Sequence, residues 1–271
     1  PWWWSQWFIA TWTIWPNGYA LKQVLRRSVD NKSRPPLKIK PHPNKNPLEK
    51  KNMDLNQARF NMIEQQIRPW EVLDPQVLAL LSTVRREDFV PMAHKALAFV
   101  DMDIPLGTAP NQVMLAPRVQ ARLLQDLAVQ KTDKVLDIGT GSGFMAALLA
   151  HQAASVLSLE IDSALAAQAQ TNLQKAGVSN AVVRCADGSA GAPADGPFDA
   201  MVISGSVAEV PAALLQQLSV GGRLVTIVGD EPMMRATLIT RTGTNSWTTT
   251  EPWDCNAPRL SGFAEPSRFK F

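Results

Sequence analysis

Predicted strands and helices alternate along the chain from Lys134, and this alternation constrains the fold more than any other feature of the sequence. Apolar runs predict strands at KVLDI, SVLSLE, NAVVRCAD, FDAMVIS and GGRLVTIVG. Helical segments follow three of them, at GFMAALLAHQ, SALAAQAQTNLQKAG and PAALLQQL. Strands joined by helical crossovers run parallel, so the pattern predicts an α/β fold with a Rossmann-like, doubly wound, mostly parallel sheet. The last segments, ATLITR, SWTTTEPWD and PSRFKF, predict antiparallel strands at one edge.

A glycine-rich loop, DIGTGSG, follows the first of these strands and opens the first helix. In an open α/β sheet, ligands bind beyond the carboxyl ends of the strands, which is where this loop lies. Glycine permits a tight turn and lets a ligand approach the backbone closely. The spacing is GxGxG, whereas a dinucleotide fingerprint has GxGxxG. We assign the loop to cofactor binding through Asp137, Gly139, Thr140, Gly141, Ser142 and Gly143.

Acidic residues end the next two predicted strands. The carboxylate of Glu160 can accept both ribose hydroxyls of an adenosine, a feature that suits NAD as well as S-adenosylmethionine. Ile161, which follows it, would pack on the adenine ring. Asp187 ends the third strand, where an acid can bind the adenine amino group, and Gly188 leaves room for the ring. The order of these residues on alternating strands predicts a site for a cofactor that contains adenosine.

Residues 1–52 differ from the rest of the chain in charge. They hold ten Lys and Arg against two Asp and Glu, which leaves 17 basic and 22 acidic residues for the remainder. The apolar run at the start precedes the positive charge, unlike a signal peptide, and it is too short and polar for a spanning helix. We expect residues 1–52 to be a leader that is disordered, at least over 31–52, or no part of the working protein. A membrane-surface anchor, indicated by six tryptophans in the first 15 residues, is the alternative.

The remainder divides into a helical segment and the α/β segment. Residues 53–117 predict a helical cap with loops, including a helix with Asp74 as N-cap and Pro75 at its first position. Residues 118–271 predict the cofactor-binding core with its C-terminal strands.

Metal and redox chemistry find little support in the composition. The three histidines lie far apart, and the two cysteines have no CxxC spacing. We therefore predict no metal site and a reducing, cytoplasmic location. The mildly acidic body argues against a nucleic-acid partner, and we expect a monomer without a membrane span.

The order of several motifs resembles that of one enzyme family. The motifs are RREDFVP, DIPLG, the proline of QVMLAP, VLDIGTGSGF, LEID, ADGSAG, PFDAMVIS and LSVGGRLV. The glycine loop is similar to that of class I S-adenosylmethionine-dependent methyltransferases, and the first two motifs resemble those of the protein-L-isoaspartate O-methyltransferases. The resemblance runs from about Met53 to Gly229 and is weaker beyond. It implies S-adenosylmethionine as cofactor and methylation of the α-carboxyl of isoaspartyl residues in damaged peptides or proteins, a repair reaction.

The resemblance also identifies a substrate loop, in which the family usually has Thr-Ile-Ser-Gln-Pro. Aligned on the proline, the loop here comprises Gln112, Val113, Met114, Leu115, Ala116, Pro117 and Arg118. Leu115 stands where the family has its catalytic Ser or Thr hydroxyl, and leucine cannot donate a hydrogen bond. The role of that hydroxyl therefore cannot be carried onto Leu115.

The fourth predicted strand ends in Ser204-Gly205-Ser206, where the family often has a small apolar run such as Thr-Ala-Ala. We hypothesise that Ser204 and Ser206 replace the missing donors or serve a different acceptor; the alternative is that they cap the next helix. Arg118 could supply positive charge to a carboxylate, or it could lie exposed without a role.

Three other functions stay open. One is a methyltransferase of the same fold with another acceptor, such as a small molecule. Another is a cofactor-binding protein that transfers no methyl group. The third, a nicotinamide oxidoreductase, is disfavoured by the GxGxG spacing.

Overall fold

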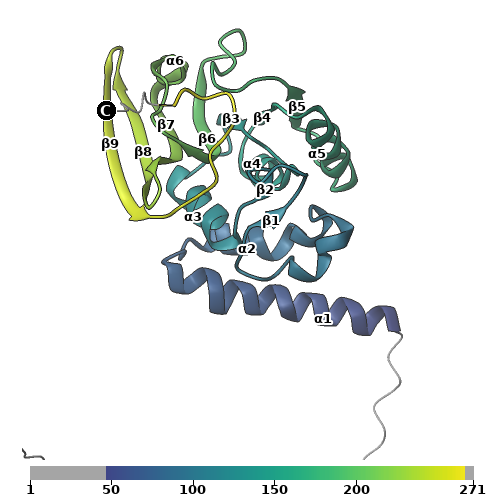
Figure 1. Ribbon diagram of the computed structural model, residues 1–271. Coiled ribbons are helices and arrows are strands. Elements are labelled where there is room, and N and C mark those ends of the chain that lie inside the picture. The colour runs from purple at the N-terminus through teal and green to yellow at the C-terminus, as the bar shows by residue number, and fades with distance from the viewer. Residues whose placement is uncertain (1–46, 266–271) are drawn as a thin grey trace, which may run out of the picture. The chain divides into compact units, whose positions relative to one another are not determined.

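A seven-stranded sheet forms the centre of the protein in a computed structural model that describes residues 47–265 (Figure 1). Its strand order is β5-β4-β3-β6-β7-β8-β9. The strands are β3 (Lys134–Ile138), β4 (Ser155–Glu160), β5 (Ala181–Cys185), β6 (Phe198–Val207), β7 (Leu218–Asp230), β8 (Met233–Gly243) and β9 (Ser246–Asp254). All pairings from β5 to β7 are parallel, and β8 and β9 add antiparallel strands at one edge. The predicted doubly wound sheet is thus confirmed, and so are the antiparallel edge strands at ATLITR and SWTTTEPWD. The strand predicted at PSRFKF, residues 266–271, lies outside the described residues.

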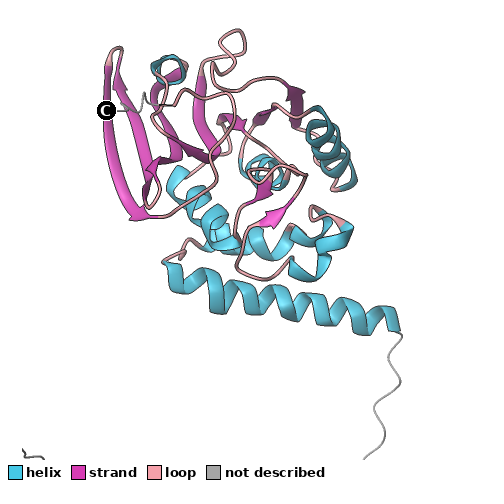
Figure 2. Ribbon diagram, viewed as in Figure 1, coloured by secondary structure: helices cyan, strands magenta, loops and turns pink. Residues whose placement is uncertain are grey.

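Helices cover both faces of this sheet (Figure 2). They are α3 (Pro117–Leu127), α4 (Phe144–Gln152), α5 (Ser163–Lys175) and α6 (Ala212–Gln216). On one face, side chains such as Val135 and Val202 share a core with α3 and α4. On the other face, Leu136 and Ile203 pack with Leu214 of α6 and with Phe263 near the C-terminus. Neighbouring residues of each strand thus enter opposite cores, as the period of a strand requires.

The segment before α3 forms the predicted helical cap. It contains α1 (Pro47–Met62), a π-helical turn η1 (Ile63–Ile67), α2 (Pro75–Thr83), and the short 3-10 turns η2 (Arg68–Trp70), η3 (Arg86–Asp88) and η4 (Met92–Leu97). The Asp74 side chain accepts hydrogen bonds from the backbone N–H groups of Gln76 and Val77, so the predicted N-cap of α2 is confirmed. Buried cap residues share one hydrophobic core with the sheet.

The start of α1 corrects one expectation. Disorder was expected through residue 52, but α1 begins at Pro47 and includes residues 47–52. The expectations for residues 1–46 lie outside the described part of the chain.

A two-stranded ribbon joins the cap to the core. Strands β1 (Ile104–Pro105) and β2 (Val113–Met114) pair antiparallel, so the DIPLG motif lies beside the substrate loop. Within residues 47–265, no helix is long and apolar enough to cross a membrane.

Candidate active site

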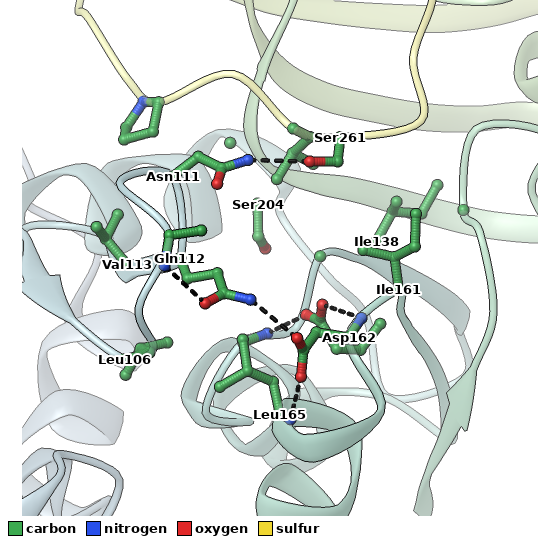
Figure 3. A pocket seen from close by; sticks show the side chains of 18 of the residues that line it. Leu106, Asn111, Gln112, Val113, Ile138, Ile161, Asp162, Leu165, Ser204 and Ser261 are labelled. Carbon is green, nitrogen blue, oxygen red and sulfur yellow. Dashed lines mark hydrogen bonds between the residues drawn. The ribbon is translucent and has the colours of Figure 1, made fainter.

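A cleft lies at the carboxyl ends of β3, β4 and β6 and encloses about 800 Å³, part of it open to solvent (Figure 3). Four parts of the chain form most of its walls: the loop from Leu106 to Leu115, the glycine loop, the segment from Leu159 to Leu165, and the C-terminal segment from Pro258 to Phe263. Gly188, Ser204 and Gly205 complete the lining. The first three of these parts include residues that the sequence assigns to cofactor or substrate, namely 112–115, 139–141 and 160–161. The glycine loop and the segment after β4 meet here because parallel strands end at one edge of the sheet.

The glycine loop forms the floor of this cleft. Gly139 and Gly141 line it and have positive φ values of 79° and 55°, which favour glycine. A Cβ atom on Gly139 would lie 3.0 Å from Leu260, and one on Gly141 would lie 2.8 Å from Leu106. Side chains would therefore close the cleft. Gly143 is different, because it is the N-cap of α4 and packs against Ala169 of α5 rather than facing the cleft.

Glu160 connects the glycine loop with the start of α5. Its carboxylate accepts hydrogen bonds from the backbone N–H groups of Gly141 (2.8 Å) and Asp162 (3.1 Å). The side chain is buried but lines the cleft, and these two bonds leave part of the acceptor capacity of its carboxylate unused. Ile161 lines the same wall with 48% of its surface exposed, an apolar face available to an adenine ring.

Gly188 and Asp187 differ in their relation to the cleft. Gly188 lines it, and a Cβ atom there would lie 2.3 Å from Ile138, so this position has no room for a side chain. Asp187 is exposed, and its carboxylate accepts the backbone N–H of Ser189 at 2.8 Å. A Cβ atom on Gly262 would lie 2.6 Å from that carboxylate, so the C-terminal segment passes directly beside it.

Asp137 lies beneath the loop rather than in the cleft. It is fully buried, and its carboxylate accepts hydrogen bonds from the hydroxyls of Ser158 and Ser204, both at 2.9 Å. Burial raises the pKa of Asp137 to about 6. Thr140 and Ser142 are also buried, and they line a smaller cavity that adjoins the cleft under the substrate loop.

The two serines at the end of β6 have separate positions. Ser204 is half-buried and lines both the cleft and the adjoining cavity. Ser206 is fully buried, and the structure does not bring it to the cleft; its backbone pairs with Pro258 and Leu260. Neither serine caps α6, whose N-cap is Pro211. The capping alternative is therefore wrong, because β6 continues to Val207.

The substrate loop, residues 112–118, is held mainly through its backbone. The guanidinium of Arg86, in the RREDFVP motif, donates to the carbonyl oxygen of Leu115 at 2.8 Å. Asp103, in the DIPLG motif, accepts the backbone N–H of Ala116 at 2.7 Å. The side chains of Val113 and Leu115 line the cleft and the adjoining cavity. The loop thus presents apolar side chains to the cleft.

The other loop residues serve its anchoring. Met114 is buried, and Pro117 is the first residue of α3. Gln112 lines the cleft and donates through Nε2 to Asp162 at 3.0 Å, which links the loop to the start of α5. Arg118 forms an ion pair with Asp101 and its guanidinium stacks over the ring of Trp70, so it is directed away from the cleft.

The C-terminal segment from Pro258 to Phe263 forms a wall of the cleft that the sequence does not predict. Leu260 lies over Gly139 and Gly205, and Asn111 donates to Ser261 at 3.0 Å and to the carbonyl of Arg259 at 3.2 Å. This contact joins the two sides of the cleft (Figure 3). The segment after β9 has no periodic pattern, so nothing local in the sequence indicated its position.

The cleft carries acidic but no basic side chains. Its charged lining residues are Glu160 and Asp162, and none of the described residues that line it is Lys, Arg or His. No cluster of three His, Cys, Asp or Glu suitable for a metal occurs within residues 47–265.

An open sheet of this order, with a glycine loop after its central strand and an acid after the next strand, is the class I methyltransferase fold, and a family match over most of the chain shows that the protein belongs to this class of enzymes. The sequence profile of the protein-L-isoaspartate(D-aspartate) O-methyltransferase family matches residues 57–254, and the chain belongs to this family.

Relatives and solved structures agree with this assignment. The chain is 41% identical over 184 residues to protein-L-isoaspartate O-methyltransferase 2 of Marinobacter nauticus, covering 68% of this chain and 83% of the relative. It is 39% identical over 187 residues to protein-L-isoaspartate O-methyltransferase 1 of Syntrophobacter fumaroxidans, covering 69% and 86%. A protein-L-isoaspartate O-methyltransferase structure from Plasmodium falciparum, in complex with S-adenosyl-L-homocysteine, has a TM-score of 0.62 at 17% identity. It covers 76% of this chain and 97% of that chain. The structural likeness shows the shared fold.

Proposed function

We propose that this protein is an S-adenosylmethionine-dependent methyltransferase that methylates the α-carboxyl group of L-isoaspartyl residues in damaged proteins. The proposal rests on one observation: the two loops that carry the family's substrate and cofactor motifs line the same cleft. The substrate loop, anchored by Arg86 and Asp103, faces the glycine loop and Glu160 across that cleft.

The residues of the cleft suit S-adenosylmethionine. Glu160 has free lone pairs for ribose hydroxyls, Ile161 offers an apolar surface for adenine, and Gly139 and Gly141 leave the floor open to close approach. When bound, this cofactor supplies an electrophilic methyl group on a positively charged sulfur. Gly188, which lines the cleft, would leave room for the adenine ring, and the neighbouring Asp187 would bind the adenine amino group.

The chemistry requires little from the protein beyond positioning. An isoaspartyl carboxyl group is already ionised at neutral pH, so one of its oxygens can attack the methyl carbon without a general base. The carbon–sulfur bond breaks as the ester bond forms, its electron pair stays on sulfur, and no proton is transferred. The cleft has no histidine, which agrees with a reaction that depends on proximity and alignment.

A second acceptor class is favoured by one observation. Val113 and Leu115 present apolar side chains where the resemblance implies hydroxyls. An acceptor with an apolar face beside its nucleophile would suit this wall better than a bare carboxylate would. We keep a small-molecule acceptor, or loss of transfer, as the alternative function.

Methyl transfer from labelled S-adenosylmethionine to an L-isoaspartyl peptide tests the proposal directly. The full chain should label this peptide and leave the matched L-aspartyl peptide unlabelled. Heating with S-adenosylhomocysteine, with NAD and without ligand tests the cofactor, and only the first should raise the melting temperature. Stabilisation without labelling of the isoaspartyl peptide would contradict the proposed acceptor and direct the search to other acceptors.

Other properties follow as proposals. The two cysteines are both free, which supports a reducing compartment such as the cytoplasm. A monomeric state, the absence of a nucleic-acid partner, and the functional division at residues 52 and 117 stay predictions.

A further inference from the structure

Ser204 lies where the main cleft and a smaller cavity adjoin. It lines the main cleft and also the smaller cavity under the substrate loop, where Val113 and Leu115 form part of the wall. Two other polar side chains of the cleft are held by partners that also line it. Asn111 binds Ser261, and Gln112 binds Asp162. Figure 3 shows Ser204 between these loop residues and Ile138.

The hydroxyl of Ser204 is fixed from below by Asp137. Its Oγ atom lies 2.9 Å from Oδ1 of this fully buried carboxylate. Ser158, on β4, donates to Oδ2 of the same carboxylate at 2.9 Å. A hydroxyl has one proton, so Ser204 cannot donate to Asp137 and to a bound acceptor at the same time.

We propose that Ser204 contacts the acceptor carboxylate, and that Asp137 decides whether the Ser204 hydroxyl donates or accepts there. When Asp137 is ionised, the proton of Ser204 is directed at it, and the hydroxyl presents lone pairs to the cleft. When Asp137 is protonated, it donates to Ser204, and the proton of Ser204 turns toward the acceptor. This inference rests on the proposed function, and it gives an enzyme without a loop hydroxyl a donor on the opposite wall.

The neighbours of Asp137 set the pH range of this switch. The charged group that acts on it is Glu160, at the end of β4, and the hydroxyls that lower its pKa belong to Thr140 of the glycine loop, Ser204 of β6 and Ser158 of β4. Burial raises the pKa of Asp137 to about 6. Because the donating state of Ser204 requires protonated Asp137, acceptor binding should strengthen as the pH falls from 7.5 to 5.5. The isoaspartyl carboxyl group stays ionised over that range.

The test compares two alanine variants in the full chain. Ser204→Ala and Ser158→Ala each remove one hydrogen bond to Asp137, but only the first removes a hydroxyl from the cleft. KM for an L-isoaspartyl peptide and kcat are measured from pH 5.5 to 8. At pH 5.5, Ser204→Ala should raise KM roughly tenfold to a hundredfold, because a donor to a charged group is lost. Ser204→Thr, which keeps a hydroxyl, should restore KM to within a few-fold.

The pH profiles separate the two roles. In the wild-type chain KM should fall toward low pH, and Ser204→Ala should show no such fall. Ser158→Ala removes a donor that stabilises ionised Asp137, so the pKa of Asp137 rises and the same fall in KM moves to higher pH. Affinity for S-adenosylhomocysteine should change less than threefold in Ser204→Ala and confirms that the variant is folded.

Each result bears on the inference. If KM of Ser204→Ala equals that of the wild type at all pH values, or if Ser158→Ala raises KM equally, the inference is wrong. If the wild-type chain does not label the isoaspartyl peptide, the proposed function fails and this inference falls with it. A readout without turnover is the ¹³C resonance of the Asp137 carboxyl group in the S-adenosylhomocysteine complex. Its titration should shift when the isoaspartyl peptide is added, and an unchanged titration contradicts the contact.

Discussion

The carboxylate of Glu160 accepts a 2.8 Å hydrogen bond from the backbone N–H of Gly141, so the acid at the end of β4 fixes the glycine loop. Replacing Glu160 with Gln keeps one acceptor oxygen but removes the charge and the second acceptor. We expect the Kd for S-adenosylhomocysteine, measured by calorimetry, to rise roughly tenfold to a hundredfold. Glu251→Gln, at an exposed acid on β9, is the control and should leave Kd unchanged.

Substitutions at Leu115 should affect both the stability of the protein and its methyl transfer activity. Its side chain is 3% exposed, so Leu115→Ser and Leu115→Ala should each lower the free energy of unfolding by about 2–4 kcal/mol. The two variants therefore differ mainly in the hydroxyl group of the serine. If a loop hydroxyl can still serve the acceptor, kcat/KM for an isoaspartyl peptide should be roughly tenfold higher in Leu115→Ser than in Leu115→Ala. Equal values in both variants would show that the hydroxyl has no role at this position.

Arg86 should be required for the position of the substrate loop. Burial lowers its pKa to about 9, so it is still charged at neutral pH, and it donates to Leu115, Ala98 and Gln120. Arg86→Met leaves these acceptors unpaired and should lower the free energy of unfolding, measured in urea, by about 3 kcal/mol or more. Arg85→Met, at the exposed neighbour, should cost less than about 1 kcal/mol. A small loss in Arg86→Met would contradict the anchoring role.

Asp137 should make stability depend on pH. Its folded pKa of about 6 lies above the ordinary value of 3.8, so the folded state holds the proton more tightly than the unfolded chain does. Stability from this group is therefore complete below pH 4 and is lost as the pH rises to 6, by about 3 kcal/mol in total. Asp137→Asn should remove this slope, as seen in urea unfolding at several pH values. A slope that persists in the variant would assign the effect to other groups.

Asn111 should control exchange of ligand through the C-terminal wall. Its side chain bonds to Ser261 and to the carbonyl of Arg259, and both bonds are lost in Asn111→Ala. We expect S-adenosylhomocysteine to dissociate several-fold faster in stopped flow, with little change in melting temperature. Asn256→Ala, at an exposed residue of the same segment, serves as the control. Unchanged dissociation in Asn111→Ala would mean that this contact does not limit release.

Local signals in the sequence sufficed for the fold and for several segments that line the cleft. The N-cap at Asp74 and the turn at Gly139 depend on neighbouring residues, so their chemistry is visible in a few letters. Gly143 was assigned to the ligand by the same pattern, although it packs against Ala169 of α5. A repeated glycine spacing does not say which glycine faces a ligand and which faces a helix.

The remaining errors come from contacts between distant segments. Ser206 was grouped with Ser204 because they are two residues apart, but β6 continues past them and buries Ser206. Arg118 was considered for the acceptor, yet it pairs with Asp101 and Trp70 on the far side of the loop. The burial of Ser206 and the contacts of Arg118 both depend on segments that are distant in sequence, so local sequence patterns could not predict either position.

The contacts that hold the substrate loop determine which substitutions it can tolerate. Its fixed points are the carbonyl of Leu115 and the N–H of Ala116, groups that every loop sequence other than one with proline at 116 would retain. Side chains at 113 and 115 can therefore be exchanged while the loop keeps its path. A substitution at either position can thus change the surface that the loop offers to an acceptor while the two backbone contacts, and the cofactor side of the cleft, stay as they are.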